Sequence, residues 1–369
     1  MKKRPIALLL LVASLLILLA SCDVADGIGN AGSATGTHAE TAGENVADVG
    51  TETGNDADET GSGTTPSTPG QTTAATTKAG TPATTAATTA ATTRATTAAT
   101  TAKPDPGYEI PQMQSAVKEP KAGDDPMKLS GIENVMRIAY VLQHAENYSV
   151  DGTGTVNAKS VGVNTKQDVK VYKDYSRGVM LQIDITTSSM VNSAAQTCYV
   201  GNKAMRREAS GGEKTWNGRK TAWKTGTPST FKSLSDYRSS YGLFGYELTN
   251  YLLNESTVTE CSAVTKNSDG TYTQTIKPDK SKASADCVKK MKTVGGLNST
   301  PTFSSIAIKL TFDRNWKILS MHVDETYEAV KKVTLFPVTA NCTASTDYTY
   351  TYGNADVSDY NSFFAQYAK

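Results

Sequence analysis

Three residues whose types could perform nucleophilic chemistry occupy alternate positions of one stretch: Ser320, His322 and Asp324. A Ser-His-Asp triad uses the imidazole to take the proton of the serine hydroxyl. If the stretch is a β-strand, its i and i+2 side chains are about 7 Å apart, because each residue rises ~3.3 Å. That distance is too long for the hydrogen bonds of a triad, so we expect no catalytic residue.

Acidic residues in the same stretch could instead bind calcium or act as an acid and base pair. Asp324 and Glu325 are adjacent, and consecutive residues of a strand face opposite sides of a sheet, so they cannot act together. Glu325 and Glu328 form the other candidate pair, and a solvated sheet face is the simpler interpretation. Because the sequence also lacks nucleotide-, phosphate- and zinc-binding motifs, we expect no metal and no other cofactor.

The N-terminus predicts where the chain works. Basic residues at positions 2–4 precede an unbroken apolar or small run at 6–20, which has the proportions of a secretory signal and is short for a membrane-spanning helix. The run ends Leu19-Ala20-Ser21-Cys22, which resembles the lipobox of bacterial lipoproteins. This resemblance implies removal of residues 1–21 and a diacylglyceryl group on Cys22. An ordinary signal peptide with Cys22 incidental is the alternative.

A lipidated Cys22 would hold the chain on the extracytoplasmic side of the cell membrane, since two acyl chains anchor a protein stably. Residues 22–106 then read as a disordered tether. Nine acidic residues and no Lys or Arg lie between Asp23 and Glu59, and Thr-Thr-Ala-Ala units follow. Such a composition cannot bury enough apolar surface to offset its ordering entropy. It fits a glycosylated stalk or a bare spacer, with a mean reach of about 50 Å for roughly 80 residues.

Four more cysteines follow the tether: Cys198, Cys261, Cys287 and Cys342. None of their spacings is typical of a zinc site. In an exported chain, four cysteines allow two disulfides with three possible connectivities, while one bridge or free thiols remain alternatives. Among the pairings we favour Cys261 with Cys287, which leaves Cys198 with Cys342.

Residues 107–369 carry the patterns of a single α+β domain. Ser130 and Glu133 form a predicted capping box, and apolar residues recur at helical spacing from Leu129 to Leu142. Two more helices are predicted, one around Leu248–Leu252 and one from Ala285 to Gly296. The strong strand patterns cover 179–185, 306–312, 319–323 and 348–352, and weaker ones cover 153–163, 168–175, 197–208, 221–224, 257–265 and 271–277. About ten mostly antiparallel strands with a few helices define the α+β class.

Charge excludes one class of partner. The chain has 37 Lys and Arg against 36 Asp and Glu, a formal net charge of +1, and the predicted domain keeps only a small positive excess. Nucleic-acid-binding domains carry a much stronger basic surface. We therefore expect no nucleic acid partner.

The order of elements resembles the lipoprotein-carrier fold of LolA and LolB, which mycobacterial lipoproteins of the LppX type share. The resemblance covers about residues 125–355, and the stretches 311–316 and 322–327 also look like strand pairs in Gram-positive lipoproteins with this fold. It implies a curved, mostly antiparallel sheet that forms an open half-barrel, with an N-terminal helix and two helical insertions. It transfers no functional residue, because the ligand site of that family is an apolar lining.

The apolar strand faces leave two functional hypotheses open. In the first, the chain is a non-catalytic lipoprotein that binds lipid or another apolar ligand in a cleft. In the second, these faces are solid core, and a structural or adhesive protein binds wall polymer or another surface protein through a tyrosine-rich exterior. An extracellular hydrolase is a third, weaker hypothesis. The candidate ligand-lining residues are Leu181, Ile183, Ile308, Leu310, Met321 and Val323.

Overall fold

The computed structural model describes residues 106–369 except 162, 189–191, 296, 298 and 334–335. These residues belong to one compact unit. The predicted signal segment, Cys22 and almost all of the predicted tether lie outside the described residues. The described residues therefore correspond to the α+β domain expected at 107–369.

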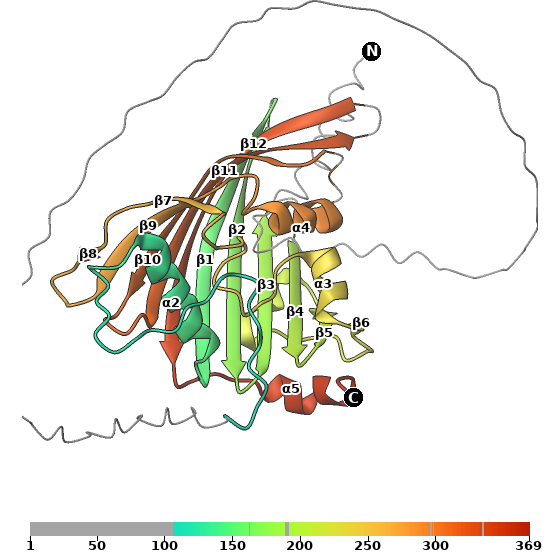
Figure 1. Cartoon of the computed structure of the whole chain (residues 1–369). Helices are drawn as coiled ribbons and strands as arrows, with labels where there is room; N and C mark the ends of the chain where they lie inside the picture. Colours follow the sequence, from blue (N-terminus) through green and yellow to red (C-terminus); the bar gives the residue numbers. More distant parts are fainter. Residues whose placement is uncertain (1–105, 162, 189–191, 296, 298, 334–335) are drawn as a thin grey trace, which may run out of the picture. The chain divides into compact units, whose positions relative to one another are not determined.

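A twelve-stranded antiparallel sheet makes up most of the domain (Figure 1). Its strands are β1 (Asn147–Ser160), β2 (Val163–Ser176), β3 (Val179–Ser188), β4 (Asn192–Val200), β5 (Lys203–Glu208), β6 (Ser229–Phe231), β7 (Val258–Cys261), β8 (Thr265–Lys266), β9 (Tyr272–Pro278), β10 (Thr302–Phe312), β11 (Ile318–Val333) and β12 (Phe336–Tyr352). Neighbours follow the order β6-β5-β4-β3-β2-β1-β12-β11-β10-β9-β7, with β8 beside β9. The described sheet is curved and open, which confirms the predicted α+β class.

Turn chemistry explains where several strands end. A turn at 267–270 joins β8 to β9, and its Gly270 has a φ of 86°. The pattern at 197–208 is two strands and not one, because the chain turns at Gly201, whose φ is 51°. The predicted strand at 221–224 is wrong as a strand, since this stretch contributes only a bridge between Ala209 and Trp223.

The first helix is present with its predicted cap. Helix α2 (Gly131–Gln143) begins after Ser130, whose hydroxyl accepts from the Glu133 backbone while the Glu133 carboxylate accepts from the Ser130 backbone. Both bonds satisfy orphan N–H groups of the first turn. Val135, Ile138 and Leu142 of α2 are almost completely buried, and Ile132 and Val141 are partly buried.

The other helical predictions are partly wrong. Helix α3 (Leu234–Tyr241) lies earlier than expected, and the described chain at 248–252 is not helical. Side chains compete with helical backbone bonds there: Thr249 Oγ1 donates to the Tyr251 carbonyl and accepts from its N–H. Helix α4 (Ala285–Gly295) is confirmed, and in it Lys290 is buried whereas Ala285 is exposed.

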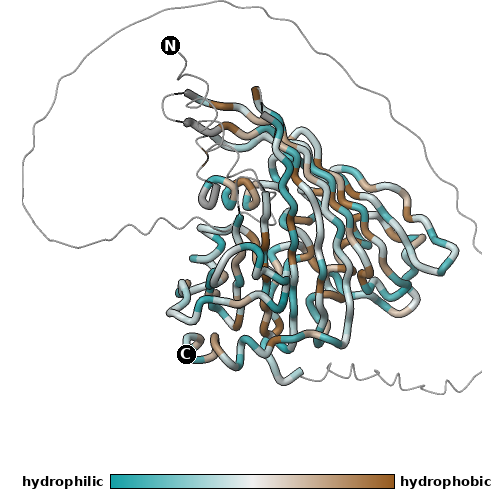
Figure 2. The backbone as a smooth tube through the Cα atoms, turned by 180° about the vertical axis from the view of Figure 1, so that it is seen from behind, coloured by the Kyte–Doolittle hydropathy of each residue, from teal (hydrophilic) through white to brown (hydrophobic). Residues whose placement is uncertain are grey.

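Short helices complete the domain: η1 (Glu213–Thr215), η2 (Gly218–Lys220), α5 (Ser358–Ser362) and η3 (Phe364–Gln366). Among the described helices, none is both long enough and apolar enough to cross a membrane. Along the central strands, hydrophobic and hydrophilic residues alternate (Figure 2). The two faces of the sheet therefore have different surroundings.

Candidate functional site

The candidate site lies on the inner face of the sheet, defined as the face covered by α2, α3, α4 and residues 242–257. Four predicted lining residues share this face and one apolar cluster: Ile308, Leu310, Met321 and Val323. Their strands β10 and β11 pair in register, with Ile308 opposite Val323 and Leu310 opposite Met321. The sequence therefore placed these four residues on a common face correctly.

The other two predicted lining residues, Leu181 and Ile183, belong to separate clusters on the outer face. Leu181 packs with Cys198, Met205 and residues of the C-terminal segment, while Ile183 packs with Trp223. Strand β3 is buried on both faces, since Met180 joins the inner cluster. The strand pattern at 179–185 is confirmed, but the alternation of its residues did not indicate which set faces the inner cluster.

An irregular segment, the cover loop (residues 242–257), lies over the inner face. Its large side chains are buried in the inner cluster: Phe244, Tyr246, Leu248, Tyr251 and Leu253. A second segment, the strap (residues 107–119), fastens the loop. The Ser115 hydroxyl accepts from Leu253 N at 3.2 Å, and Ala116 N donates to the Leu253 carbonyl at 2.9 Å.

Glu247 fixes the cover loop to the strap through a buried carboxylate. Its two oxygens accept the backbone N–H groups of Gln114 and Ser115. Glu247 is only 2% exposed. Burial raises the pKa of Glu247, while the hydrogen bonds from the strap and the charge of Lys173 oppose that shift.

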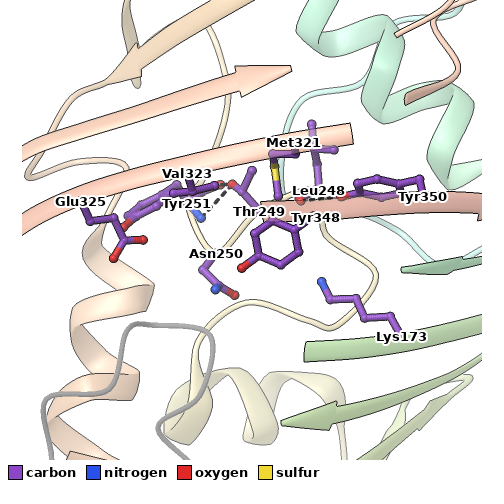
Figure 3. Close-up of a pocket in the computed structure, with 10 residues that line it drawn as sticks. All are labelled: Lys173, Leu248, Thr249, Asn250, Tyr251, Met321, Val323, Glu325, Tyr348 and Tyr350. Carbon is purple, nitrogen blue, oxygen red and sulfur yellow. Dashed lines mark hydrogen bonds between the residues drawn. The ribbon is translucent and has the colours of Figure 1, made fainter. Parts of the chain in front are cut away.

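A small recess lies between the cover loop and the sheet (Figure 3). Its walls are formed by Lys173, Leu248, Thr249, Asn250, Tyr251, Met321, Val323, Glu325, Tyr348 and Tyr350. Lys173 and Glu325 stand on opposite sides of the group in Figure 3, with Met321 between them. The Tyr350 hydroxyl donates to the Leu248 carbonyl at 3.4 Å. The cavity volume of about 10 Å³ holds about one water molecule.

The inner face is not uniformly apolar. Glu325 is only 4% exposed, although the sequence interpretation placed its carboxylate on a solvated face. The two-residue period of the strand could have predicted this burial, because it places Glu325 on the same face as Val323 and Tyr327. Asp184 on β3 and Arg206 on β5 are also buried. A ligand on this face would meet both apolar and polar groups.

His322 faces outward and contacts two carboxylates. Its Nδ1 lies 2.6 Å from Asp347 Oδ1, and its Nε2 lies 3.0 Å from Asp324 Oδ2. The expectation that i and i+2 side chains are too distant to bond was therefore wrong for this pair, because both side chains extend along the sheet. Both imidazole nitrogens face carboxylates, which leaves neither aimed at Ser320. Among the described residues, no group of three or more His, Cys, Asp and Glu is arranged to hold a metal.

The favoured disulfide pairings are wrong, because Cys198, Cys261 and Cys342 are free thiols. Cys198 lies on the outer face of β4, whereas Cys342 lies on the inner face of β12, well separated in the strand order. Cys261 lies against α2: a Cβ on Gly131 would approach its Sγ to 2.7 Å. Cys287 lies instead on α4. The spacing of the cysteines in the sequence does not indicate which face of the sheet, or which helix, each side chain lies on.

No family model and no curated protein matches the chain. Among solved structures, a DUF1329 family protein from Desulfovibrio piger aligns with 9% identity over 64% of this chain and 97% of its own, at a TM-score of 0.23. A Vibrio parahaemolyticus domain named for outer membrane lipoprotein sorting aligns with 10% identity over 63% of this chain and 96% of its own, at a TM-score of 0.22.

Proposed function

We propose that the chain is a membrane-anchored extracytoplasmic lipoprotein whose domain binds lipid or another apolar ligand without catalysis. The lipobox-like end at Cys22 supports the anchor. The observation that supports binding is an irregular cover loop over an apolar sheet face, with a recess beneath it that Met321 and Val323 line. Pockets on curved sheets and barrels commonly accept apolar ligands in this position.

The cover loop must move for a ligand larger than water to enter. Its attachments to the strap are individual hydrogen bonds and not a continuous helix or strand ladder. Opening would expose buried side chains of the loop such as Phe244, Tyr246 and Leu248, so an apolar ligand would have to replace their contacts. Lys173 and Glu325 in the recess would suit a ligand with a polar end.

Lipid extraction of the purified full chain followed by mass spectrometry tests the binding proposal. We expect a co-isolated lipid with the wild-type chain and much less with Val323→Phe, which fills the recess. Ile183→Phe is the matched control, because Ile183 is equally buried on the outer face. Absence of lipid from the wild-type chain, or equal loss in both variants, would contradict the proposal.

The anchor is tested separately by metabolic labelling with a fatty acid. We expect the wild-type chain to carry label and to sediment with membranes, and Cys22→Ala to lose both properties. Unlabelled wild-type protein, or a Cys22→Ala chain that still sediments with membranes, would contradict the anchor while leaving the ligand proposal open.

One observation favours the alternative, a structural or adhesive surface protein. The recess under the cover loop has room for about one water molecule, so this part of the core is nearly solid. In that case binding to wall polymer or to another protein would use the exterior. A lipid-free preparation of the wild-type chain would favour this second function.

A further inference from the structure

A larger groove lies apart from the inner-face recess, where the strap passes the turn between β4 and β5. Its volume is about 360 Å³, which falls in the range of about 300–1,000 Å³ for small-molecule sites. Four segments form its sides: the strap, the turn at 201–202, α3 and the cover loop. The lining consists of Glu109, Pro111, Gln112, Gln114, Gly201, Asn202, Leu234, Ser235, Arg238, Phe244 and Tyr246.

Hydrogen bonds hold the sides of the groove in place. The Gln143 amide donates to the Pro111 carbonyl at 2.7 Å and ties the strap to α2. On the opposite side, Leu234 N donates to the Asn202 carbonyl at 3.1 Å and joins α3 to the turn. The groove is therefore present before any ligand binds, which lowers the ordering cost of binding.

The guanidinium that lines the groove is already engaged. Arg238 donates through Nε and Nη2 to Asp286 Oδ2 at 3.2 and 2.7 Å, and through Nη1 to Gln114 Oε1 at 2.7 Å. Asp286, which also pairs with Lys289 Nζ at 3.1 Å, engages two of the guanidinium nitrogens and Gln114 engages the third, so in the described lining no guanidinium nitrogen is left without a partner for a phosphate or a carboxylate. The other charged lining residue is Glu109, which accepts hydrogen bonds and would repel an anion.

The polar groups that remain suit hydroxyl groups. One bond already engages each of three amides: Gln112 Nε2 donates to the Ile110 carbonyl, Gln114 Oε1 accepts from Arg238, and Asn202 Oδ1 accepts from Leu234 N. An amide oxygen has two lone pairs and an amide nitrogen has two hydrogens, so these side chains and the Ser235 hydroxyl can still both donate and accept. A sugar hydroxyl also donates and accepts, whereas a phosphate only accepts. Phe244 and Tyr246 are about 6% and 5% exposed and supply aromatic surface within the lining. Aromatic surface beside a few placed polar groups is typical of small-molecule sites.

We propose that this groove binds a neutral saccharide. Amide and serine side chains would bond the hydroxyl groups, and the less polar face of a sugar ring would contact the aromatic surface. This site is distinct from the inner-face recess, because the two share no lining residue, although the cover loop contributes to both. A negative result for lipid would leave the saccharide proposal intact, and the reverse also holds.

Isothermal titration of the full chain with three neutral trisaccharides tests the proposal. The probes are maltotriose, cellotriose and the β-1,4 trimer of N-acetylglucosamine, with inorganic phosphate and trialanine as comparisons. We expect at least one saccharide to bind, and neither comparison to compete with it. Gln112→Ala should weaken binding about fivefold, the effect of losing one hydrogen bond.

Ser235→Trp should abolish saccharide binding, because Ser235 lines the groove and an indole would fill it. Asp236→Trp is the matched control: Asp236 is the next residue of α3, is exposed, and does not line the groove. Thermal melting checks that each variant is folded. If Ser235→Trp does not fold, Gln112→Ala still tests the proposal. The proposal would be overturned if no saccharide bound, or if trialanine or phosphate displaced the bound saccharide. It would also be overturned if Ser235→Trp bound like the wild-type chain at a normal melting temperature, or if Gln112→Ala left binding unchanged.

Discussion

His322 lies on the outer face between Asp347 and Asp324, at 2.6 and 3.0 Å. Partial burial disfavours the imidazolium, but the two carboxylates outweigh it and raise the pKa of His322. A raised pKa stabilises the fold below the unfolded value of about 6.5, and this contribution is lost as pH rises through the folded pKa.

We therefore expect wild-type stability to fall relative to His322→Gln between about pH 5.5 and 8.5, a window that brackets the unfolded pKa. The difference should stay below about 1 kcal/mol, because the side chain is 35% exposed and solvent screens the pairs. Urea unfolding at both pH values measures the change, and NMR titration of the imidazole measures the pKa. A His322 pKa at or below its ordinary value would contradict the pairing.

Glu247 should give a second pH dependence of the same sign. Burial raises the pKa of this carboxyl group despite the opposing hydrogen bonds from Gln114 and Ser115. Its contribution is complete below the unfolded pKa of about 4.3 and is lost as pH rises through the folded pKa. Glu247→Gln cannot titrate, so wild-type stability should fall relative to this variant as pH rises above the unfolded pKa. Urea titrations from about pH 4 to 8 measure the difference, which would be independent of pH if the carboxyl group had an ordinary pKa.

At the scale of elements, the start of α2 is fixed by the capping box of Ser130 and Glu133. Ser130→Ala removes the side-chain half of the capping box and should cost about 1 kcal/mol of unfolding free energy. Ser130→Asp should restore most of the loss, because aspartate also accepts from the N-terminal N–H groups. Thermal or urea unfolding measures both changes. Equal losses in the two variants would show that the hydroxyl does not act as a cap.

The C-terminal segment, α5 with η3, covers part of the outer face. Phe364 is completely buried against Cys198 and its neighbours, and the Arg207 guanidinium lies 4.2 Å from the centre of the Phe363 ring. Arg207 Nη2 also pairs with Asp359 Oδ2 at 3.0 Å. These contacts seal the Cys198 thiol, and burial raises its pKa well above the usual range.

Phe364→Ala should loosen this cover and expose Cys198. Removing a buried phenylalanine costs about 3–5 kcal/mol, although local release of the segment limits the effect on the whole domain. We expect Cys198 to be alkylated faster under native conditions. Peptide mass spectrometry measures the extent of this modification over time. Phe303→Ala is the matched control, since Phe303 is buried on the inner face. An equal increase in both variants would mean global unfolding and not local release.

At the scale of the whole molecule, the sheet separates Cys198 from Cys342 and so keeps both as free thiols. Cys198 and Cys342 cannot meet through a sheet that separates their faces. Alkylation of the denatured, unreduced chain should therefore modify Cys198, Cys261 and Cys342, as free thiols. Detection of a Cys198–Cys342 or Cys261–Cys287 cross-linked peptide would contradict the structure.

Local patterns carried much of the architecture. The Ser130 capping box, the turn at 267–270 and the period-2 strands are encoded within a few residues, since caps, turns and strand alternation depend on nearby backbone geometry. The helix expected at 248–252 failed because its apolar residues are buried by the sheet and strap, and helical spacing does not distinguish that environment.

The sequence by itself determined most of the strands, the first helix and the common face of Ile308, Leu310, Met321 and Val323. Only the tertiary structure decided that Leu181 and Ile183 face the other way, that the thiols are separated, and that a strap, a turn and a helix enclose a groove. The alternation of residues along a strand indicates that two sets of side chains face opposite sides of the sheet, but it does not indicate which elements cover each side. That choice depends on contacts between residues far apart in the chain.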